Sequence, residues 1–194
     1  TATSNSTKLY TAPVKNTTRE WKLVDYIDNS TFNASDVSLD SLYIFPQHVV
    51  VEGRQEGLRR VWVAQLDENN MVQGVNQLHF EESAHYVSLA RRQDYHSNKV
   101  LVTYESMVTP PSFLEIDLFD TSQRQILHQQ TIPGYRKGDY RCERLEVRSR
   151  DGTTKIPISL VYRRNANVPC PLHLLGYGAY GHSLEPSFAP LRLS

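Results

Sequence analysis

The feature that most constrains the fold of this chain is a series of short segments in which apolar and polar residues alternate. A period of two is typical of β-strands, and the segments are separated by Gly, Asn, Asp and Pro residues that favour turns. The clearest pair of candidate strands is 48–52 and 58–66, and Gly53–Gly57 between them is predicted to form the turn. With weaker candidates at 37–44 and 73–80, they predict a first set of four strands.

A second set of four strands follows the same plan, at the ranges 84–90, 99–105, 112–118 and 125–129. Four-strand units that recur about every 45 residues are the pattern of β-propeller blades. Residues 8–10 and 21–26 would then belong to the end of a preceding blade. We predict two blades and part of a third, with an open β-sandwich as the alternative because it shares short alternating strands. Since a propeller ring needs four to eight blades, we expect the chain to be part of a longer protein.

The pattern of predicted strands changes near residue 136. Two alternating segments, 141–149 and 155–163, flank Asp151–Gly152, which is a strong signal for the turn of a β-hairpin. The compact apolar run at 171–175 then predicts a strand buried on both faces, as in a parallel sheet. We therefore expect a second domain to begin near residue 137.

Charge and composition exclude several classes of protein. Lys plus Arg number 21 and Asp plus Glu number 21, so the chain lacks the basic excess of a nucleic-acid or membrane-surface binder. Its apolar runs are far shorter than the roughly 20 residues of a membrane helix. Two cysteines, Cys142 and Cys170, and a polar stretch at 1–7 favour a cytoplasmic location over a secreted disulfide framework. Scattered His and Cys residues give no metal-ligand spacing, so we expect no metal.

A glycine-rich loop follows the apolar run, with the sequence GYGAYG at 176–181. It matches G-x-G-x-x-G, but Pro186 and Pro190 disfavour the helix that a dinucleotide site requires after the last glycine. Glycines beyond a buried strand also suit an active-site loop, where a tyrosine hydroxyl can donate a hydrogen bond to a developing oxyanion. The alternative is that the two tyrosines only pack.

Two blocks of sequence resemble the oligopeptidase B branch of the prolyl oligopeptidase family of serine peptidases. They are RCERLEVRSRDGTTKIPISLVYR at 141–163 and LLGYGAYGHSLEPSF at 174–188, and the region upstream fits as well. The resemblance implies a seven-bladed β-propeller that caps an α/β-hydrolase domain with a Ser-Asp-His triad. The fold class would then be mixed, with a partial β-propeller over 1–136 and the truncated start of the α/β-hydrolase domain over 137–194.

The same resemblance assigns three candidate site residues. Tyr177 falls on the family's oxyanion tyrosine, whose hydroxyl stabilises the tetrahedral intermediate. Tyr180 falls on an aromatic residue that lines the pocket for the residue preceding the scissile bond. Glu185 falls on the first of two acidic positions that contact an upstream basic residue of the substrate. The second acidic position holds Ser187, which departs from that pattern.

The implied reaction is cleavage of peptides after Arg or Lys through an acyl-enzyme, with no cofactor. The chain contains no G-x-S-x-G nucleophile motif, so we expect the triad beyond residue 194 and an inactive chain when it stands alone. A prolyl-specific oligopeptidase of the same family and a non-catalytic propeller module for protein interaction are the alternatives. The residues do not indicate an oligomeric state.

Overall fold

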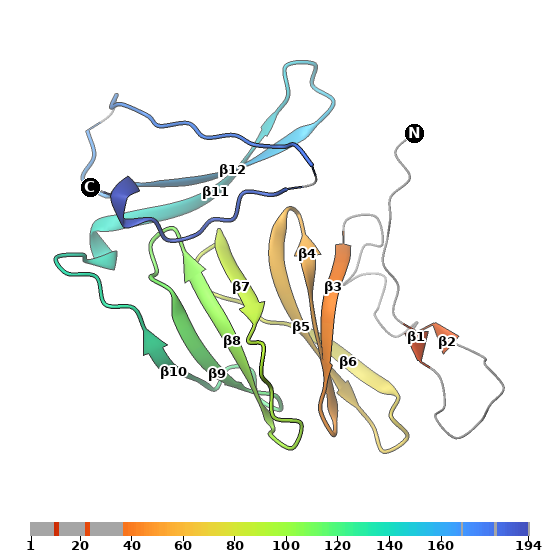
Figure 1. Cartoon of the computed structure of the whole chain (residues 1–194). Coiled ribbons are helices and arrows are strands. Elements are labelled where there is room, and N and C mark those ends of the chain that lie inside the picture. Colours follow the sequence, from red (N-terminus) through yellow and green to blue (C-terminus); the bar gives the residue numbers. More distant parts are fainter. Residues whose placement is uncertain (1–9, 12–21, 24–36, 168, 181, 194) are drawn as a thin grey trace.

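The structure is a computed structural model, and it describes residues 10–11, 22–23, 37–167, 169–180 and 182–193 (Figure 1). Two four-stranded antiparallel sheets form its main body, and in each sheet neighbouring strands follow one another in the sequence. The first blade consists of β3 (Val37–Ile44), β4 (His48–Gln55), β5 (Leu58–Leu66) and β6 (Val72–Gln77). The second blade consists of β7 (His85–Leu89), β8 (Lys99–Ser106), β9 (Ser112–Asp117) and β10 (Arg124–Gln129). This meander is the topology of a propeller blade, and it confirms both predicted sets of strands.

A short two-stranded sheet precedes the blades. It pairs β1 (Tyr10–Thr11) with β2 (Lys22–Leu23) in antiparallel register. The other residues of the predicted segments 8–10 and 21–26 lie outside the described residues.

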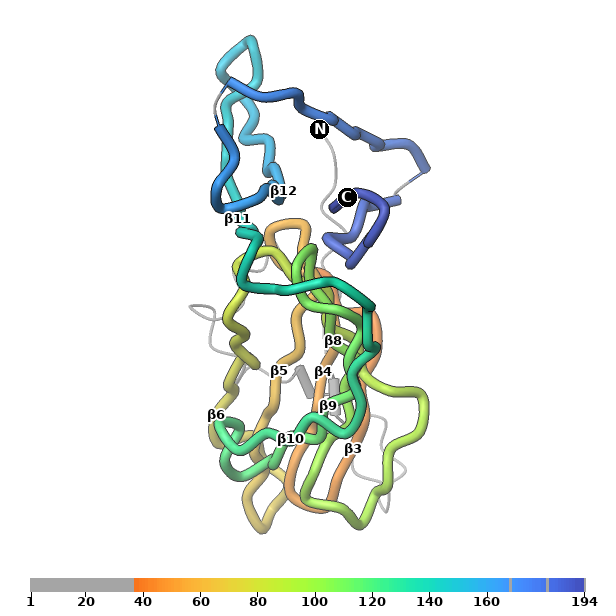
Figure 2. Tube along the Cα trace, turned by 90° about the vertical axis from the view of Figure 1, so that its left-hand side faces the viewer, coloured from red at the N-terminus to blue at the C-terminus, as the bar shows by residue number. Residues whose placement is uncertain are grey.

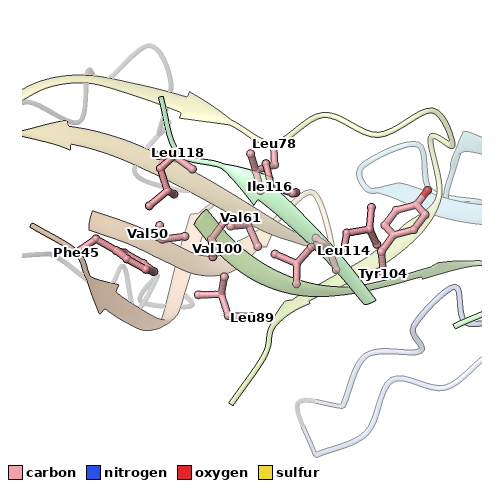
Figure 3. Packing of buried hydrophobic residues seen from close by; sticks show 13 residues of the cluster. Phe45, Val50, Val61, Leu78, Leu89, Val100, Tyr104, Leu114, Ile116 and Leu118 are labelled. Carbon is pink, nitrogen blue, oxygen red and sulfur yellow. The ribbon is translucent and has the colours of Figure 1, made fainter. Parts of the chain in front are cut away.

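The core lies between the two blades and is built from side chains that the period of two directs inward. Phe45, Val50 and Val61 of the first blade pack with Val100 and Ile116 of the second, and each is at most 1% exposed (Figure 3). Burying one such side chain contributes about 1.5–3 kcal/mol. The two blades therefore stabilise each other, and neither sheet buries its apolar face alone.

Gly53 corrects one predicted element, because it lies inside β4 and not in a turn. A β-bulge at Asp40 in the facing strand β3 brings the chain against Gly53, where an added Cβ would lie 2.2 Å from the carbonyl oxygen of Ser38. Only glycine permits this approach of two backbones. The turn lies further on, where Glu56 and Gly57 adopt positive φ angles of 53° and 74°.

Beyond the second blade the chain forms a hairpin at the end of the molecule where the β4–β5 turn lies (Figures 1 and 2). The 3₁₀-helix η1 (Lys137–Asp139) leads into β11 (Tyr140–Arg148), which pairs along its whole length with β12 (Lys155–Arg163). Gly152 has a φ of 73° in the connecting turn, as the Asp151–Gly152 signal predicts. A second 3₁₀-helix, η2 (Pro190–Arg192), lies near the end of the described chain.

The prediction of a buried strand at 171–175 is wrong for this structure. Leu172, Leu174 and Leu175 are 73%, 77% and 51% exposed, and the run has no strand conformation. The sheet of β11 and β12 has two strands only, so no described strand pairs with the run. An apolar strand is buried only when neighbouring elements cover it, and these are not among the described residues.

The described residues contain neither a membrane-spanning helix nor a cluster of metal ligands. None of the helices there is long and apolar enough to cross a membrane. No group of three or more His, Cys, Asp and Glu side chains among them could hold a metal ion.

Candidate functional site

The three residues that the sequence analysis assigned to a site lie on the segment after β12, which passes back toward the blades (Figure 1). Tyr177 is 53% exposed and its ring meets the ring of His182 edge-on, with 6.4 Å between the centroids. Tyr180 is almost fully exposed and has a φ of 56°, an uncommon conformation for a residue other than glycine. Within the described residues, no hydrogen bond or ring contact joins either tyrosine to Glu185.

The glycines of this loop are not required by local packing in this structure. A Cβ added at Gly176 or at Gly178 would meet nothing within 4 Å. Gly181, the last glycine of the predicted motif, lies outside the described residues. The two tyrosines of the loop are therefore exposed to solvent, and no other part of the described chain packs closely against Gly176 or Gly178.

Glu185 has a different environment, because its side chain turns toward the first blade and is 19% exposed. Its Oε1 atom accepts a hydrogen bond from Nη2 of Arg54 and lies 3.4 Å from Nε of Arg59. Arg54 is on β4 and Arg59 is on β5, directly opposite each other in the register of the two strands. One carboxylate thus joins the predicted substrate-binding segment to both strands of this hairpin.

A buried carboxylate, that of Glu52, holds Arg59 of the arginine pair in place. Glu52 is 5% exposed and accepts hydrogen bonds from Nη1 of Arg59, from Oγ of Ser88 at 2.9 Å and from the backbone N–H of Leu89 at 3.2 Å. Ser88 and Leu89 belong to the second blade. Glu52 therefore fixes Arg59 and at the same time ties the two blades together, which satisfies its buried charge.

Arg54 and Arg59 are not among the site residues predicted from the sequence, although the sequence contains a signal for them. Two like charges that face each other across strands destabilise a hairpin unless an anion lies nearby. With the turn placed at Glu56–Gly57, the register of 48–55 against 58–66 sets Arg54 opposite Arg59 and predicts an acidic partner for the pair. The turn predicted at Gly53–Gly57 hid this pair because it removed Arg54 from the strand.

A second buried carboxylate, Glu82, fastens the connection between the second blade and the hairpin. It accepts hydrogen bonds from the hydroxyls of Tyr104 and Thr109, and Nζ of Lys137 lies 2.6 Å away. Burial acts to raise the pKa of Glu82, but these three partners outweigh it and hold the pKa below its usual value. Glu82 is therefore ionised at neutral pH and holds the start of β11 in place through Lys137.

Hydrogen bonds also hold the end of the described chain against the second blade and the start of β11. The carboxylate of Glu105 accepts from the N–H of Phe188 at 2.9 Å, and the Tyr140 hydroxyl donates to the carbonyl of Leu193 at 2.7 Å. Val108, Tyr140 and Leu193 form a small apolar cluster there. Residues 185–193 are thus anchored at both of their ends.

An open pocket of about 640 Å³ lies beside the Glu82 anchor. Phe80, Tyr104, Arg124 and Lys137 are among its lining residues. Tyr177, Tyr180 and Glu185 do not line it. The pocket is therefore separate from the site that the sequence predicts.

Comparison with known proteins identifies the family. A family model described as the N-terminal β-propeller domain of prolyl oligopeptidase matches residues 2–130, well over half of the chain. The chain belongs to the prolyl oligopeptidase family. The two four-stranded sheets are accordingly blades of the propeller of this family.

Two curated proteins and a solved structure are similar to this chain. Protease 2 of Moraxella lacunata is 34% identical over 158 residues, which are 80% of this chain and 22% of that protein. Dipeptidyl aminopeptidase BI of Pseudoxanthomonas mexicana is 32% identical over 190 residues, 96% of this chain and 25% of that protein. Oligopeptidase B from Trypanosoma brucei, in a closed form with covalently bound antipain, has a TM-score of 0.68 at 30% identity and covers 79% of this chain. The chain spans between 22% and 25% of the length of these relatives.

Proposed function

We propose that this protein is part of a serine oligopeptidase that cleaves peptides after Arg or Lys through an acyl-enzyme. The observation that carries the proposal is the likeness to oligopeptidase B, at 30% identity over 79% of the chain. The blocks at 141–163 and 174–188 support it, because they resemble the same branch of the family.

The reaction requires a serine hydroxyl oxygen that attacks the carbonyl carbon of the scissile bond while a histidine takes its proton. The C–N bond then breaks, the amine leaves with that proton, and water hydrolyses the resulting ester. The 194 residues contain no G-x-S-x-G motif, so we place the nucleophile in the further length that the relatives have. Tyr177 would donate its hydroxyl proton in a hydrogen bond to the oxyanion, and within the described residues this hydroxyl has no competing partner.

Tyr180 and Glu185 would bind the substrate. Glu185 already contacts two guanidinium groups in this structure, so its surroundings accept the charge and shape of a basic side chain. Tyr180 is exposed and would present its ring to the residue before the scissile bond. Ser187 stands where a second acid is expected, so recognition of the upstream basic residue would depend on Glu185.

The test is an assay of the full-length protein with peptide amides that differ only in carrying Arg, Lys or Pro before the scissile bond. We expect hydrolysis of the Arg and Lys substrates, together with covalent labelling by a serine-directed fluorophosphonate. Cleavage of the Pro substrate alone would favour the prolyl-specific alternative. Absence of both hydrolysis and labelling would favour a non-catalytic propeller module.

A further inference from the structure

The two arginines that contact Glu185 are held very differently. Arg59 is anchored by the buried carboxylate of Glu52, with Asp40 3.7 Å away and the ring of Tyr86 centred 5.4 Å from its guanidinium carbon. The side chain of Arg54 has Glu185 as its one hydrogen-bonding and ion-pairing partner among the described residues. Loss of the Glu185 contact would therefore release Arg54 but leave Arg59 in place.

The carboxylate of Glu185 is not saturated by these contacts. Both arginines approach the same oxygen, Oε1, while the buried Oε2 atom and the buried Nη1 atom of Arg54 make no hydrogen bond within the described part of the chain. A guanidinium and a carboxylate interact most strongly when two parallel N–H···O bonds form. The contact between Arg54 and Glu185 lacks the second bond, so another guanidinium that supplies both bonds can replace it.

We propose that Arg54 is an internal competitor for the substrate, occupying on Glu185 the place that a basic peptide side chain takes. This inference rests on the proposed function, since it needs Glu185 to bind an upstream basic residue. Arg54 carries the same guanidinium group as that residue when it is arginine. A dibasic peptide therefore binds by exchange with Arg54, while Arg59 continues to orient the carboxylate.

The exchange affects substrate preference, because the Arg54–Glu185 contact is lost only when a peptide binds Glu185. A peptide with an uncharged side chain upstream of the cleaved Arg leaves the Arg54 contact intact, so its binding free energy is not reduced by the exchange. A dibasic peptide gains its own contact with Glu185 but loses that of Arg54. Arg54 thereby reduces the discrimination between dibasic and monobasic peptides that Glu185 would otherwise provide.

The test uses the full-length protein and two peptide amides, with Arg-Arg or Ala-Arg before the scissile bond. Arg54→Met removes the charge and keeps most of the aliphatic stem. We expect it to lower KM for the Arg-Arg substrate about fivefold relative to the Ala-Arg substrate, as fits removal of a half-buried ion pair, with kcat unchanged. Glu185→Gln should abolish both the dibasic preference and the effect of Arg54→Met.

The matched control is Lys99→Met, which removes one positive charge from an exposed ion pair with Glu115 on the second blade and should leave the ratio of KM values unchanged. If Arg54→Met does not fold, Arg54→Lys should produce a smaller change in the same direction, because ammonium cannot form the planar guanidinium contact. An unchanged ratio, or a higher KM for Arg-Arg, would overturn the competition while leaving the peptidase proposal intact. Failure of the wild-type protein to cleave either substrate would instead overturn the proposed function.

Discussion

Replacement of Gly53 by alanine tests the close approach of β3 and β4 at the residue next to Arg54. The added Cβ would lie 2.2 Å from the carbonyl oxygen of Ser38 and 3.1 Å from Cα of Leu39. Both contacts are with backbone, which cannot rotate away, so the strands must separate by about 1 Å to restore ordinary van der Waals distances. Overpacking of this kind costs about 1–3 kcal/mol, and we expect the upper end, because part of the ladder at the bulge is also lost.

The assay is urea unfolding monitored by tryptophan fluorescence, since Trp62 on β5, the strand that pairs with β4, is fully buried. With a slope of about 2–3 kcal/mol per molar urea, a loss near 3 kcal/mol lowers the midpoint by about 1–1.5 M. Gly74→Ala is the matched control, because a Cβ there meets nothing within 4 Å, and we expect a change below about 0.5 kcal/mol. Equal stability of the Gly53→Ala and Gly74→Ala proteins would refute the close approach and the bulge at Asp40 with it.

Three further predictions concern the site and its supports. Tyr177→Phe should lower kcat of the proposed full-length peptidase about 10²–10³-fold, the usual effect of losing one oxyanion donor. Tyr95→Phe, with a similarly exposed ring on the second blade, should have no effect. Glu82→Gln should destabilise the protein by about 1–3 kcal/mol at pH 7. Because the pKa of Glu82 is lowered by folding, its ionised form stabilises the protein above the unfolded pKa, and this contribution is lost as the pH falls through the folded pKa. The difference in urea midpoint between wild type and Glu82→Gln should therefore shrink toward acid pH, and a constant difference would contradict it. In the 194-residue chain, Leu174→Ser should change the unfolding free energy by less than about 0.5 kcal/mol, since Leu174 is 77% exposed, and a larger loss would show that this run is buried after all.

The blades could be predicted because their signal is local. Strands 37–44 and 58–66 have in the structure the bounds that the alternation indicates, since the period of two states which side chains a sheet will bury. The hairpin turn at Asp151–Gly152 is equally local, because Gly152 supplies the positive φ that the turn needs. In each case the residues that decide the conformation are neighbours in the sequence.

Two errors have a common physical origin in long-range contact. The sequence predicts a turn at Gly53 because glycine favours turns, whereas in the structure Gly53 allows the backbone of β3, a strand earlier in the chain, to approach closely. The apolar run at 171–175 predicts a buried strand, whereas burial depends on which other elements pack against it. Neither the close approach of a distant strand to Gly53 nor the packing of other elements against 171–175 can be inferred from residues adjacent in the sequence.

The sequence by itself determined the propeller blades and their strands, together with the motif on which Tyr177, Tyr180 and Glu185 lie, because alternation and short motifs are properties of adjacent residues. Only the tertiary structure decided that Glu185 meets Arg54 and Arg59, and that Glu52 and Glu82 are buried anchors. The contacts of Glu185 with Arg54 and Arg59 join residues that are more than 100 positions apart. Their formation depends on how the blades pack and where the chain returns, and no local pattern specifies either.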